Sequence, residues 1–583
     1  MSQTTLCRES RWSRFRRSMV RAGTFVLLLL IFPVSMHADE QAALLTLRAV
    51  NLLLLGGGGS SGGSTTCSVY YESSDPKYDL SYQGLWYYRP EMSHNSYRLT
   101  QLTDIEFNHL SMYDRRKVAD KLLSSLFFGY PAPVLNQMLR SGNFLCSIRQ
   151  RLFSERNNMA KVEEEIRDEE KFYRDDNSWR PYEAFDILAR FYAMDYLDNH
   201  FLHNWIAYIL TQTIMFSPAY ELDSSHYPDI SSVYNWLVMD MDDDVGMRYS
   251  TYLHMTSVDN WRRFRSPEDN GREMLEIYTL DFDDTHVPMA ATTLKNWFLD
   301  EDHDTLVIGL NGNTVPQPLF GTSVTTGFEF YRELVKSNGF VSGSVRRLVD
   351  FFFTDATDAR KQQITELLVA SNPETWEDIL VQILFSREYL LNSTRAKSAE
   401  ELFYSLVKKL EYKHYQHTFP DFFENLDRMH QATMKYKLGK LERVPLDTLS
   451  FACYHKYIRE TVLLHAVCGD EEENYYDSWN NYGWRPALLG NDRFSYNENN
   501  PEATLRSFIT YLFEFLVHRP PDSAEMAMFL DNMLRDDGRY EWSYDFAAVN
   551  DSTGCYDRRE QTARDVFDYL SRLSELYVYQ EVQ

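Results

Sequence analysis

Apolar residues recur at intervals of three and four along most of the chain, which is the spacing of one face of an α-helix. Four such segments follow one another between residues 328 and 385, and another lies between residues 563 and 577. Helix-start sequences accompany this pattern at residues 103–106 and 522–525. The pattern predicts an all-α protein with a large, irregular multi-helix architecture.

Strand signals are sparse by comparison. Residues 305–310 (TLVIGL) precede Asn311-Gly312-Asn313 and predict one short strand followed by a turn. Strand and helix segments do not alternate as a doubly wound sheet requires, and no short-period repeat is found. We therefore expect few or no strands.

The N-terminal 38 residues have the pattern of an export signal. Six arginines precede the apolar segment 24–34, which is too short to span a bilayer, and Ala38 offers a cleavage point. Residues 16–21 also resemble a twin-arginine motif, so that route is an alternative to Sec export. We expect a periplasmic or extracellular protein without an integral membrane span in the mature chain.

Residues 39–66 combine an apolar run with a Gly/Ser-rich tract and are expected to form a tether. Lipid anchoring is not favoured, because Cys67 lies beyond the place of a lipidated cysteine. Three helical regions are expected to follow: residues 67–180, a core at 181–415 and a C-terminal region at 416–583.

Five cysteines remain after cleavage at Ala38. In an oxidising compartment an odd number allows at most two disulfides and leaves one thiol, and the pairing stays open. The five are Cys67, Cys146, Cys453, Cys468 and Cys555.

The formal net charge of −26 at pH 7 argues against two classes of partner. Nucleic acids are bound largely through Lys and Arg, and anionic lipid surfaces repel an acidic protein. The hydrophobic share of 44% and the aromatic share of 15% are sufficient for a large core, which excludes general disorder.

A cluster of charged residues lies in residues 266–282. On a helix, Asp269, Arg272, Glu273 and Glu276 share one face. Such a carboxylate–guanidinium cluster can bind a metal or act in acid–base chemistry. The periodicity favours a solvated helix face instead, and a buried ion-pair network is a further alternative.

Histidines provide a second group of candidates. His200 and His203 have the i, i+3 spacing of metal ligands on a helix, although no H-E-x-x-H sequence occurs and a structural role is the commoner one. His303 and Asp304 lie in an acidic run, for which a solvated loop is the alternative. Residues 239–246 resemble the start of an EF-hand, but Val245 occupies the position where an EF-hand requires glycine.

These elements resemble the large bacterial family catalogued as domain of unknown function 1800. Its hallmark P-N-E-N-[FY]-[AG]-R-E-L-x-E-L-[FY]-[ST]-L-G is similar to residues 268–280 (EDNGREMLEIYTL), with direct matches at Arg272, Glu273, Glu276, Tyr278, Thr279 and Leu280. Further similar elements are residues 290–297, residues 197–201 with His200, and a reduced His303-Asp304 element that lacks the family's lysine.

The resemblance implies an exported helical protein and selects its candidate residues. The catalytic candidates are Arg272, Glu273 and Glu276, and the ligands for a divalent metal would be His200, His303, Asp304 and Glu273. The family has no established reaction. Its members often accompany a second exported family, domain of unknown function 1501, which resembles sulfatases, so the resemblance implies a sulfatase-like partner.

We therefore expect an exported envelope protein that binds or matures a partner protein. The alternative is a metal-dependent hydrolase or transferase acting on an envelope or extracellular substrate. A glycan-binding protein is a third hypothesis, which rests on the aromatic content alone.

Overall fold

The computed structural model describes eight long segments of the chain and one pair of residues: 97–130, 132–154, 196–215, 230–300, the pair 302–303, 305–412, 448–464, 500–534 and 558–582. Single positions or pairs are also described within 187–194 and 422–441 and at 484. All of these belong to one structural unit, residues 62–583. The expected signal peptide, residues 1–38, and the whole expected tether, residues 39–66, lie outside the described residues.

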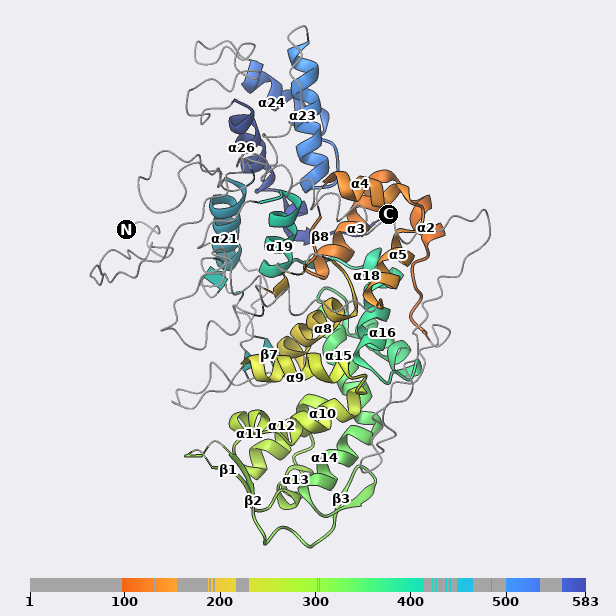
Figure 1. The fold of residues 1–583 in the computed structure, drawn as a ribbon, viewed down its shortest axis with the longest axis vertical. Helices are drawn as coiled ribbons and strands as arrows, with labels where there is room; N and C mark the ends of the chain where they lie inside the picture. Colours follow the sequence, from red (N-terminus) through yellow and green to blue (C-terminus); the bar gives the residue numbers. More distant parts are fainter. Residues whose placement is uncertain are drawn as a thin grey trace, which may run out of the picture. The chain divides into compact units, whose positions relative to one another are not determined.

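The described residues are predominantly helical, which confirms the all-α prediction (Figure 1). The helices in chain order are α2 (Asp104–His109), α3 (Met112–Ser125), α4 (Ala132–Arg140), α5 (Phe144–Leu152), α8 (Asn199–Thr213), α9 (Ile230–Asp242), α10 (Met247–Met255), α11 (Val258–Arg263), α12 (Pro267–Thr279), α13 (Val287–Thr293), α14 (Gly327–Lys336), α15 (Asn338–Phe352), α16 (Asp358–Ala370), α17 (Trp376–Leu384), α18 (Arg387–Leu390), α19 (Ala399–Lys409), α21 (Thr448–Tyr457), the π-helix η3 (Ile458–Leu463), α23 (Pro501–Leu516), α24 (Ser523–Leu534), α26 (Arg558–Leu570) and α27 (Ser574–Tyr577). Within this part of the chain no helix has the length and apolar character of a membrane span.

The strands form four short antiparallel pairs. They are β1 (Trp297–Asp300) with β2 (Thr305–Ile308), β3 (Gln317–Leu319) with β4 (Thr322–Val324), β5 (Arg395–Ala396) with β8 (Val578–Tyr579), and β6 (Tyr436–Lys437) with β7 (Lys440–Leu441). The strand predicted at residues 305–310 is therefore present as β2. Apolar residues between 287 and 297 have helical spacing, but the helix α13 ends at Thr293, and Trp297 begins β1 with its side chain buried.

Local sequence determines where several helices begin. Thr103 and Glu106 form the capping box expected at the start of α2. Asp522 accepts hydrogen bonds from the backbone N–H groups at the start of α24, after the two prolines. These contacts satisfy N–H groups that have no partner inside their own helix.

Two helices in the middle of the unit are buried on all sides. In α8 every residue from His200 to Thr213 is buried, and all of α17 is buried as well. α8 packs against α9, α15 and α17. Polar side chains of α8 are consequently enclosed together with its apolar ones, and each requires a partner within the protein.

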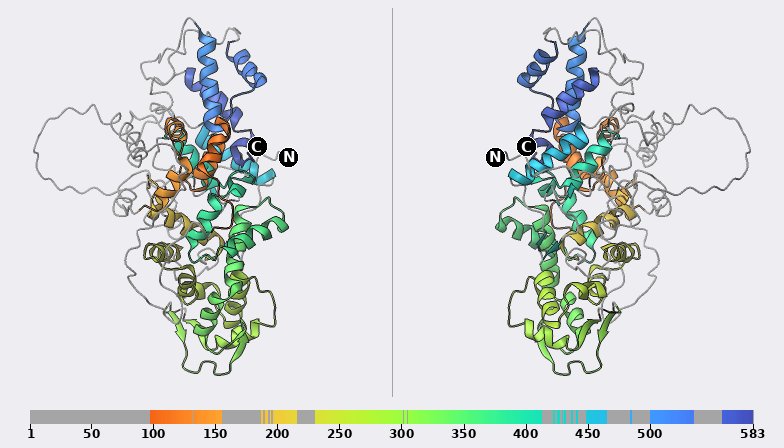
Figure 2. Two further views of the ribbon diagram at one scale, coloured as in Figure 1. Left: turned by 90° about the vertical axis from the view of Figure 1, so that its right-hand side faces the viewer. Right: turned by 90° about the vertical axis from the view of Figure 1, so that its left-hand side faces the viewer.

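The C-terminal segment returns to helices from the beginning of the described chain (Figures 1 and 2). Arg395 in β5 is paired with Tyr579 in β8, and Tyr113 and Arg116 of α3 both bond to Glu514 of α23. These contacts join residues from all three of the expected helical regions. The division into three regions stays a prediction.

A glycine permits a close crossing of two helices. Gly343 of α15 lies against the backbone of Tyr278 in α12, and a Cβ there would overlap the Tyr278 carbonyl group. Gly271 of α12 similarly faces Ala290 of α13, where a Cβ would lie 2.9 Å from the alanine Cβ. Because these two glycines have no Cβ, α12 can pack directly against α13 and α15.

We expect Gly343→Ala to lower the free energy of unfolding by about 2 kcal/mol, because the added methyl group forces the two helices apart. Chemical denaturation measures this loss. Gly312→Ala is the matched control, since a Cβ there meets nothing within 4 Å. Equal stability of the two variants would contradict the proposed crossing.

Candidate functional site

The charged face of α12 is divided between solvent and core. Arg272 Nη1 donates to Asp284 Oδ1 over 2.7 Å and lies 3.9 Å from Glu276 Oε1, and all three side chains reach solvent. Such exposed pairs contribute little to stability. Arg272 and Glu276 therefore match the solvated-face alternative.

Glu273 differs from these neighbours because it is only 7% exposed. Burial, together with the negative charges of Glu276 and Asp269, raises the pKa of Glu273 to about 7. The solvated-face interpretation is wrong for this residue. A buried carboxyl that titrates near neutral pH is a functional candidate as well as a source of instability.

His303 lies in the turn between β1 and β2, with its side chain 77% exposed. Its Nδ1 is 2.9 Å from Asp300 Oδ2, and its backbone N–H donates to Asp300 Oδ1. This contact closes the turn. Asp304 lies outside the described residues, and no contact of the described residues joins His303 to Glu273 or to His200.

His200 meets a carboxylate that comes from the acidic end of α9. Its Nδ1 lies 3.1 Å from Asp242 Oδ2, and its Nε2 lies 2.9 Å from the amide nitrogen of Asn204. Tyr234 donates to the Asn204 oxygen over 2.5 Å, which fixes the amide orientation. The two ring nitrogens of His200 therefore face the carboxylate of Asp242 and the side-chain amide of Asn204.

His203 lies one helical turn further along α8 and bridges two carboxylates. Its Nδ1 is 2.5 Å from Asp242 Oδ1 and its Nε2 is 3.2 Å from Glu377 Oε1 of α17. Burial opposes the charge, but the bonds to both carboxylates raise the pKa of His203 to about 9. At Asp242, burial would raise the pKa, but the hydrogen bonds with His200 and His203 outweigh it and lower the pKa to about 2.

The His200–His203 pair predicted from the sequence is thus brought together with Asp242 and Glu377. The EF-hand-like run supplies Asp242 as a partner for imidazoles, with α10 following directly after it. The described residues contain no group of three or more His, Cys, Asp and Glu side chains placed to hold a metal ion. This site is an ion-pair joint between α8, α9 and α17.

A second charged cluster surrounds Asp120 of α3, which is only 2% exposed. Lys397 Nζ lies 3.2 Å from Asp120 Oδ2, Lys409 of α19 pairs with Oδ1, and His518 Nε2 lies 3.1 Å from Oδ2. Burial would raise the pKa of Asp120, but the two lysines and His518 lower it well below its usual range. Asp120 is therefore charged at every physiological pH.

Another buried cluster of charged side chains lies beside the Asp120 cluster. Arg395 of β5 makes a two-point ion pair with Glu401 and donates to the hydroxyl group of Tyr389 over 2.8 Å. Lys121 donates to the Ser393 carbonyl over 2.6 Å. Burial, with Arg395 nearby, lowers the pKa of Lys121 to about 7.

Sequence reasoning missed both buried clusters. The members of the Asp120 cluster lie far apart along the chain, and spacing rules detect only residues that are neighbours on one element. One signal was present: Asp120-Lys121 interrupts the otherwise apolar end of α3, where charged residues require buried partners.

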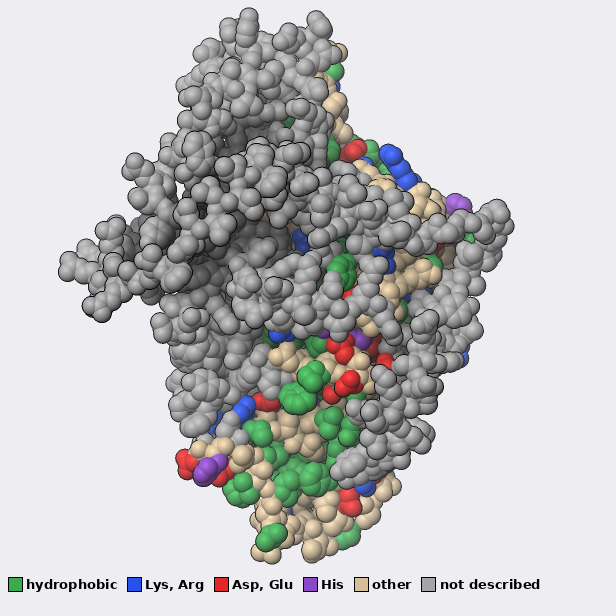
Figure 3. Space-filling model, in the orientation of Figure 1, with side chains coloured by type: hydrophobic (Ala, Val, Ile, Leu, Met, Phe, Trp, Pro, Cys, Tyr) green, Lys and Arg blue, Asp and Glu red, His purple; other side chains and the backbone are tan. Residues whose placement is uncertain are grey.

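Exposed apolar side chains gather in the segment that carries β1 to β4. Figure 3 shows hydrophobic side chains over the part of the face where α10, α12, β1 and β2 lie. Five of the thirteen exposed large hydrophobic side chains among the described residues fall within residues 298–328, and Leu310 is 103% exposed. We call these five residues the hairpin surface: Phe298, Ile308, Leu310, Val315 and Phe328. They are close in sequence but do not share one face, because the register of β1 with β2 places Phe298 and Ile308 on opposite sides of that hairpin.

The hairpin surface is attached to the core by defined contacts. Trp297 is buried, and its ring centroid lies 4.8 Å from that of Phe328. Asn313 donates to the Thr325 carbonyl over 2.8 Å, which ties the loop before β3 to the start of α14. The exposed side chains are therefore presented on a fixed backbone.

Comparison of the chain with protein-family models, with curated proteins and with solved structures finds no match. The resemblance to the domain of unknown function 1800 family thus rests on the sequence elements described above and stays a prediction.

We expect His203→Gln to lower the free energy of unfolding by about 3 kcal/mol at pH 6, because two carboxylates lose their shared cation. The contribution of His203 is complete below its unfolded pKa of 6.5 and is lost as the pH rises through about 9. Urea denaturation at pH 6, 8 and 9.5 should show that the difference in the free energy of unfolding between wild type and His203→Gln becomes smaller as the pH rises. His303→Gln, at an exposed turn, should show no such trend.

Glu273→Gln should raise the free energy of unfolding by about 2 kcal/mol at pH 8, because it removes a charge from a buried site. The folded pKa is above the unfolded value of 4.5, so the destabilisation by Glu273 is absent below pH 4.5, grows as the pH rises to about 7 and is constant above that. Thermal unfolding across this pH range measures it. A similar gain in Glu276→Gln would argue against burial as the cause.

Proposed function

We propose that this protein is an exported helical protein that binds a partner protein through the hairpin surface. The concentration of exposed apolar side chains on the β1–β4 segment is the observation that supports the proposal. Single exposed apolar residues are ordinary, whereas several on one fixed segment are typical of protein interaction sites. Aromatic and long aliphatic side chains are also the residues that anchor interfaces.

The charge at the edge of the hairpin surface suggests the chemistry of the partner. Asp300 and Asp302 lie in the turn of the β1–β2 hairpin, and the whole chain carries a net charge of −26. A partner with an apolar patch bordered by Lys or Arg would complement both features. An exported sulfatase-like protein is the first partner to test, and this choice rests on the family resemblance alone.

Export is part of the same proposal and rests mainly on the N-terminal sequence pattern. The disulfide bond at Cys146 supports it, because disulfides persist in oxidising compartments such as the periplasm. Cys453 is not in a disulfide.

The alternative of a metal-dependent hydrolase or transferase receives no support from the described contacts. That site requires His200, Glu273, His303 and Asp304 to converge. The structure pairs His200 with Asp242 and His303 with Asp300, while Glu273 is buried in α12.

We expect tagged wild-type protein to recover one stoichiometric partner from periplasm. Phe298→Asp combined with Leu310→Asp should weaken the affinity for that purified partner at least tenfold, since two buried anchors each contribute about 1 kcal/mol or more. Ile105→Asp is the matched control: Ile105 is 61% exposed but lies on α2.

Two results would contradict the proposal. One is recovery of no stoichiometric partner by the wild-type protein. The other is a partner that the double variant retains with unchanged affinity. Circular dichroism of each variant shows whether the helical fold is preserved.

A further inference from the structure

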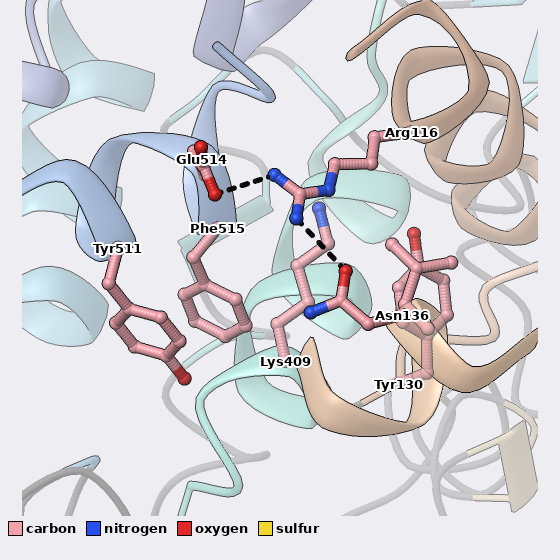
Figure 4. A pocket seen from close by; sticks show the side chains of 8 residues that line it. Arg116, Tyr130, Asn136, Lys409, Tyr511, Glu514 and Phe515 are labelled. Atoms are coloured by element: carbon pink, nitrogen blue, oxygen red, sulfur yellow. Dashed lines mark hydrogen bonds and ion pairs between the residues drawn. The ribbon is translucent and has the colours of Figure 1, made fainter. Parts of the chain in front are cut away.

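The small cavity beside the Asp120 cluster is a place for water rather than for a ligand. It lies between α3, α4, α19 and α23, and its polar lining includes Arg116, Lys409 and Glu514 (Figure 4). Its volume of about 30 Å³ has room for about one or two water molecules, which would also satisfy the buried hydroxyl group of Tyr130. The exposed side of α9, in contrast, has the features of a binding surface.

Two large apolar side chains of α9 lie in solvent on one side of the helix. Trp236 is 61% exposed and Met239 is 53% exposed, whereas Tyr234, Leu237 and Met241 of the same helix are buried. Residues three apart are neighbours on a helix surface, so the two exposed side chains form one apolar area. Aromatic residues and Met are enriched in protein interfaces relative to the rest of the protein surface.

The same side of α9 continues into two aspartates. Asp240 follows Trp236 by four residues and Asp243 follows Met239 by four, so each lies one helical turn beyond an apolar side chain. The backbone N–H of Asp243 still donates to the Met239 carbonyl, which keeps Asp243 in helical geometry. Within the described part of the chain neither aspartate side chain makes a hydrogen bond or an ion pair. We call these four residues the α9 face: Trp236, Met239, Asp240 and Asp243.

The two aspartates lie at the end of α9 where negative charge is least favourable. Its free carbonyl groups give the C-terminus of a helix a partial negative charge, and the last turn of α9 has no basic residue to offset it. Partial burial, together with the charge of Asp243, raises the pKa of Asp240 to about 7. A cation from another molecule would relieve this repulsion.

The backbone of α9 is fixed from its buried side. The helix packs against α8, and Tyr234 donates to the side-chain oxygen of Asn204 over 2.5 Å. The neighbouring Asp242 is bonded to both His200 and His203. The α9 face is therefore presented on a helix that core contacts hold in place, so little of the binding free energy is lost in ordering it.

The apolar area extends from α9 onto α10. The two helices pack together, and Leu253 of α10 is 37% exposed. Figure 3 shows hydrophobic side chains over the part of the face where α9 and α10 lie, with acidic side chains beside them. The surface thus combines an apolar area with a negatively charged border.

We propose that the α9 face docks an amphipathic, basic helix of a partner protein. Its apolar side chains would pack on Trp236 and Met239, and its Lys or Arg side chains would pair with Asp240 and Asp243. The backbone groups of α9 are bonded within the helix, so the contact is made by side chains, as when one helix packs on another. An anionic membrane surface does not fit, since the aspartates would repel it.

The test is fluorescence anisotropy of two labelled peptides of about 18 residues, which is long enough to form a helix. One is an amphipathic peptide of Leu, Ala and Lys, and in the other Glu replaces every Lys. At about 0.15 M salt the Lys peptide should bind the purified chain at micromolar concentration, and the Glu peptide should bind about tenfold more weakly or worse. Trp236→Ala combined with Met239→Ala should weaken binding of the Lys peptide about tenfold or more, because both apolar anchors are lost.

A second pair of variants tests the charges. Asp240→Asn combined with Asp243→Asn should weaken binding of the Lys peptide about fivefold, because the partner cations lose their counterions. Glu268→Gln combined with Asp302→Asn is the matched control, since it removes the same charge from exposed positions on other elements. The control should leave the affinity unchanged within about twofold.

Docking on the α9 face and binding through the hairpin surface can fail separately. Phe298→Ala combined with Leu310→Ala alters the hairpin surface alone and should leave binding of the Lys peptide unchanged. If that variant loses the peptide instead, the peptide binds at the hairpin surface and docking on the α9 face is wrong.

Four further results would overturn the proposed docking. They are no binding of the Lys peptide at about 100 μM, equal binding of the Glu peptide, unchanged affinity without the two apolar side chains, and equal losses in the matched control and in the variant without the two aspartates. Substitutions at surface positions have small effects on stability, so every variant should unfold near the wild-type temperature by circular dichroism.

Discussion

One buried carboxylate, that of Asp120, joins segments that lie far apart along the chain. Lys397 and Lys409 reach it from either end of the segment that leads into and through α19, and His518 reaches it from the connection between α23 and α24. Lys397 is 277 residues away in sequence. Without this charge the two lysines would be buried without a counterion, which costs several kcal/mol. The mutual position of α3, α19 and the helices after residue 500 therefore depends on it.

The same physical solution recurs in the middle of the unit. α8 is buried on all sides, so its histidines must be satisfied internally, and His203 bridges Asp242 of α9 and Glu377 of α17. In both clusters a titratable group is fixed between partners on different elements. Lys409 adds a connection, because it belongs to the Asp120 cluster and also lines the cavity.

The proposed function depends on side chains that, unlike the buried charged groups, have no such partners within the described part of the protein. Charged groups in the core are paired, whereas the hairpin surface presents apolar side chains to solvent and Tyr130 presents an unused donor to a cavity. The proposed recognition of a partner protein uses the first of these features. Glu273 is a third departure, because burial raises its pKa and so marks a cost in stability.

The sequence by itself determined the helical class, the start of α2 and α24, the strand at Thr305–Ile308 and the meeting of His200 and His203 on one helix. These depend on residues within a few positions of one another, where spacing and capping rules apply. Only the tertiary structure decided that Glu273 is buried while Arg272 is not, and that Asp120 meets Lys397, Lys409 and His518. Burial and long-range ion pairing arise when distant segments pack together, and no local pattern encodes which segments will meet.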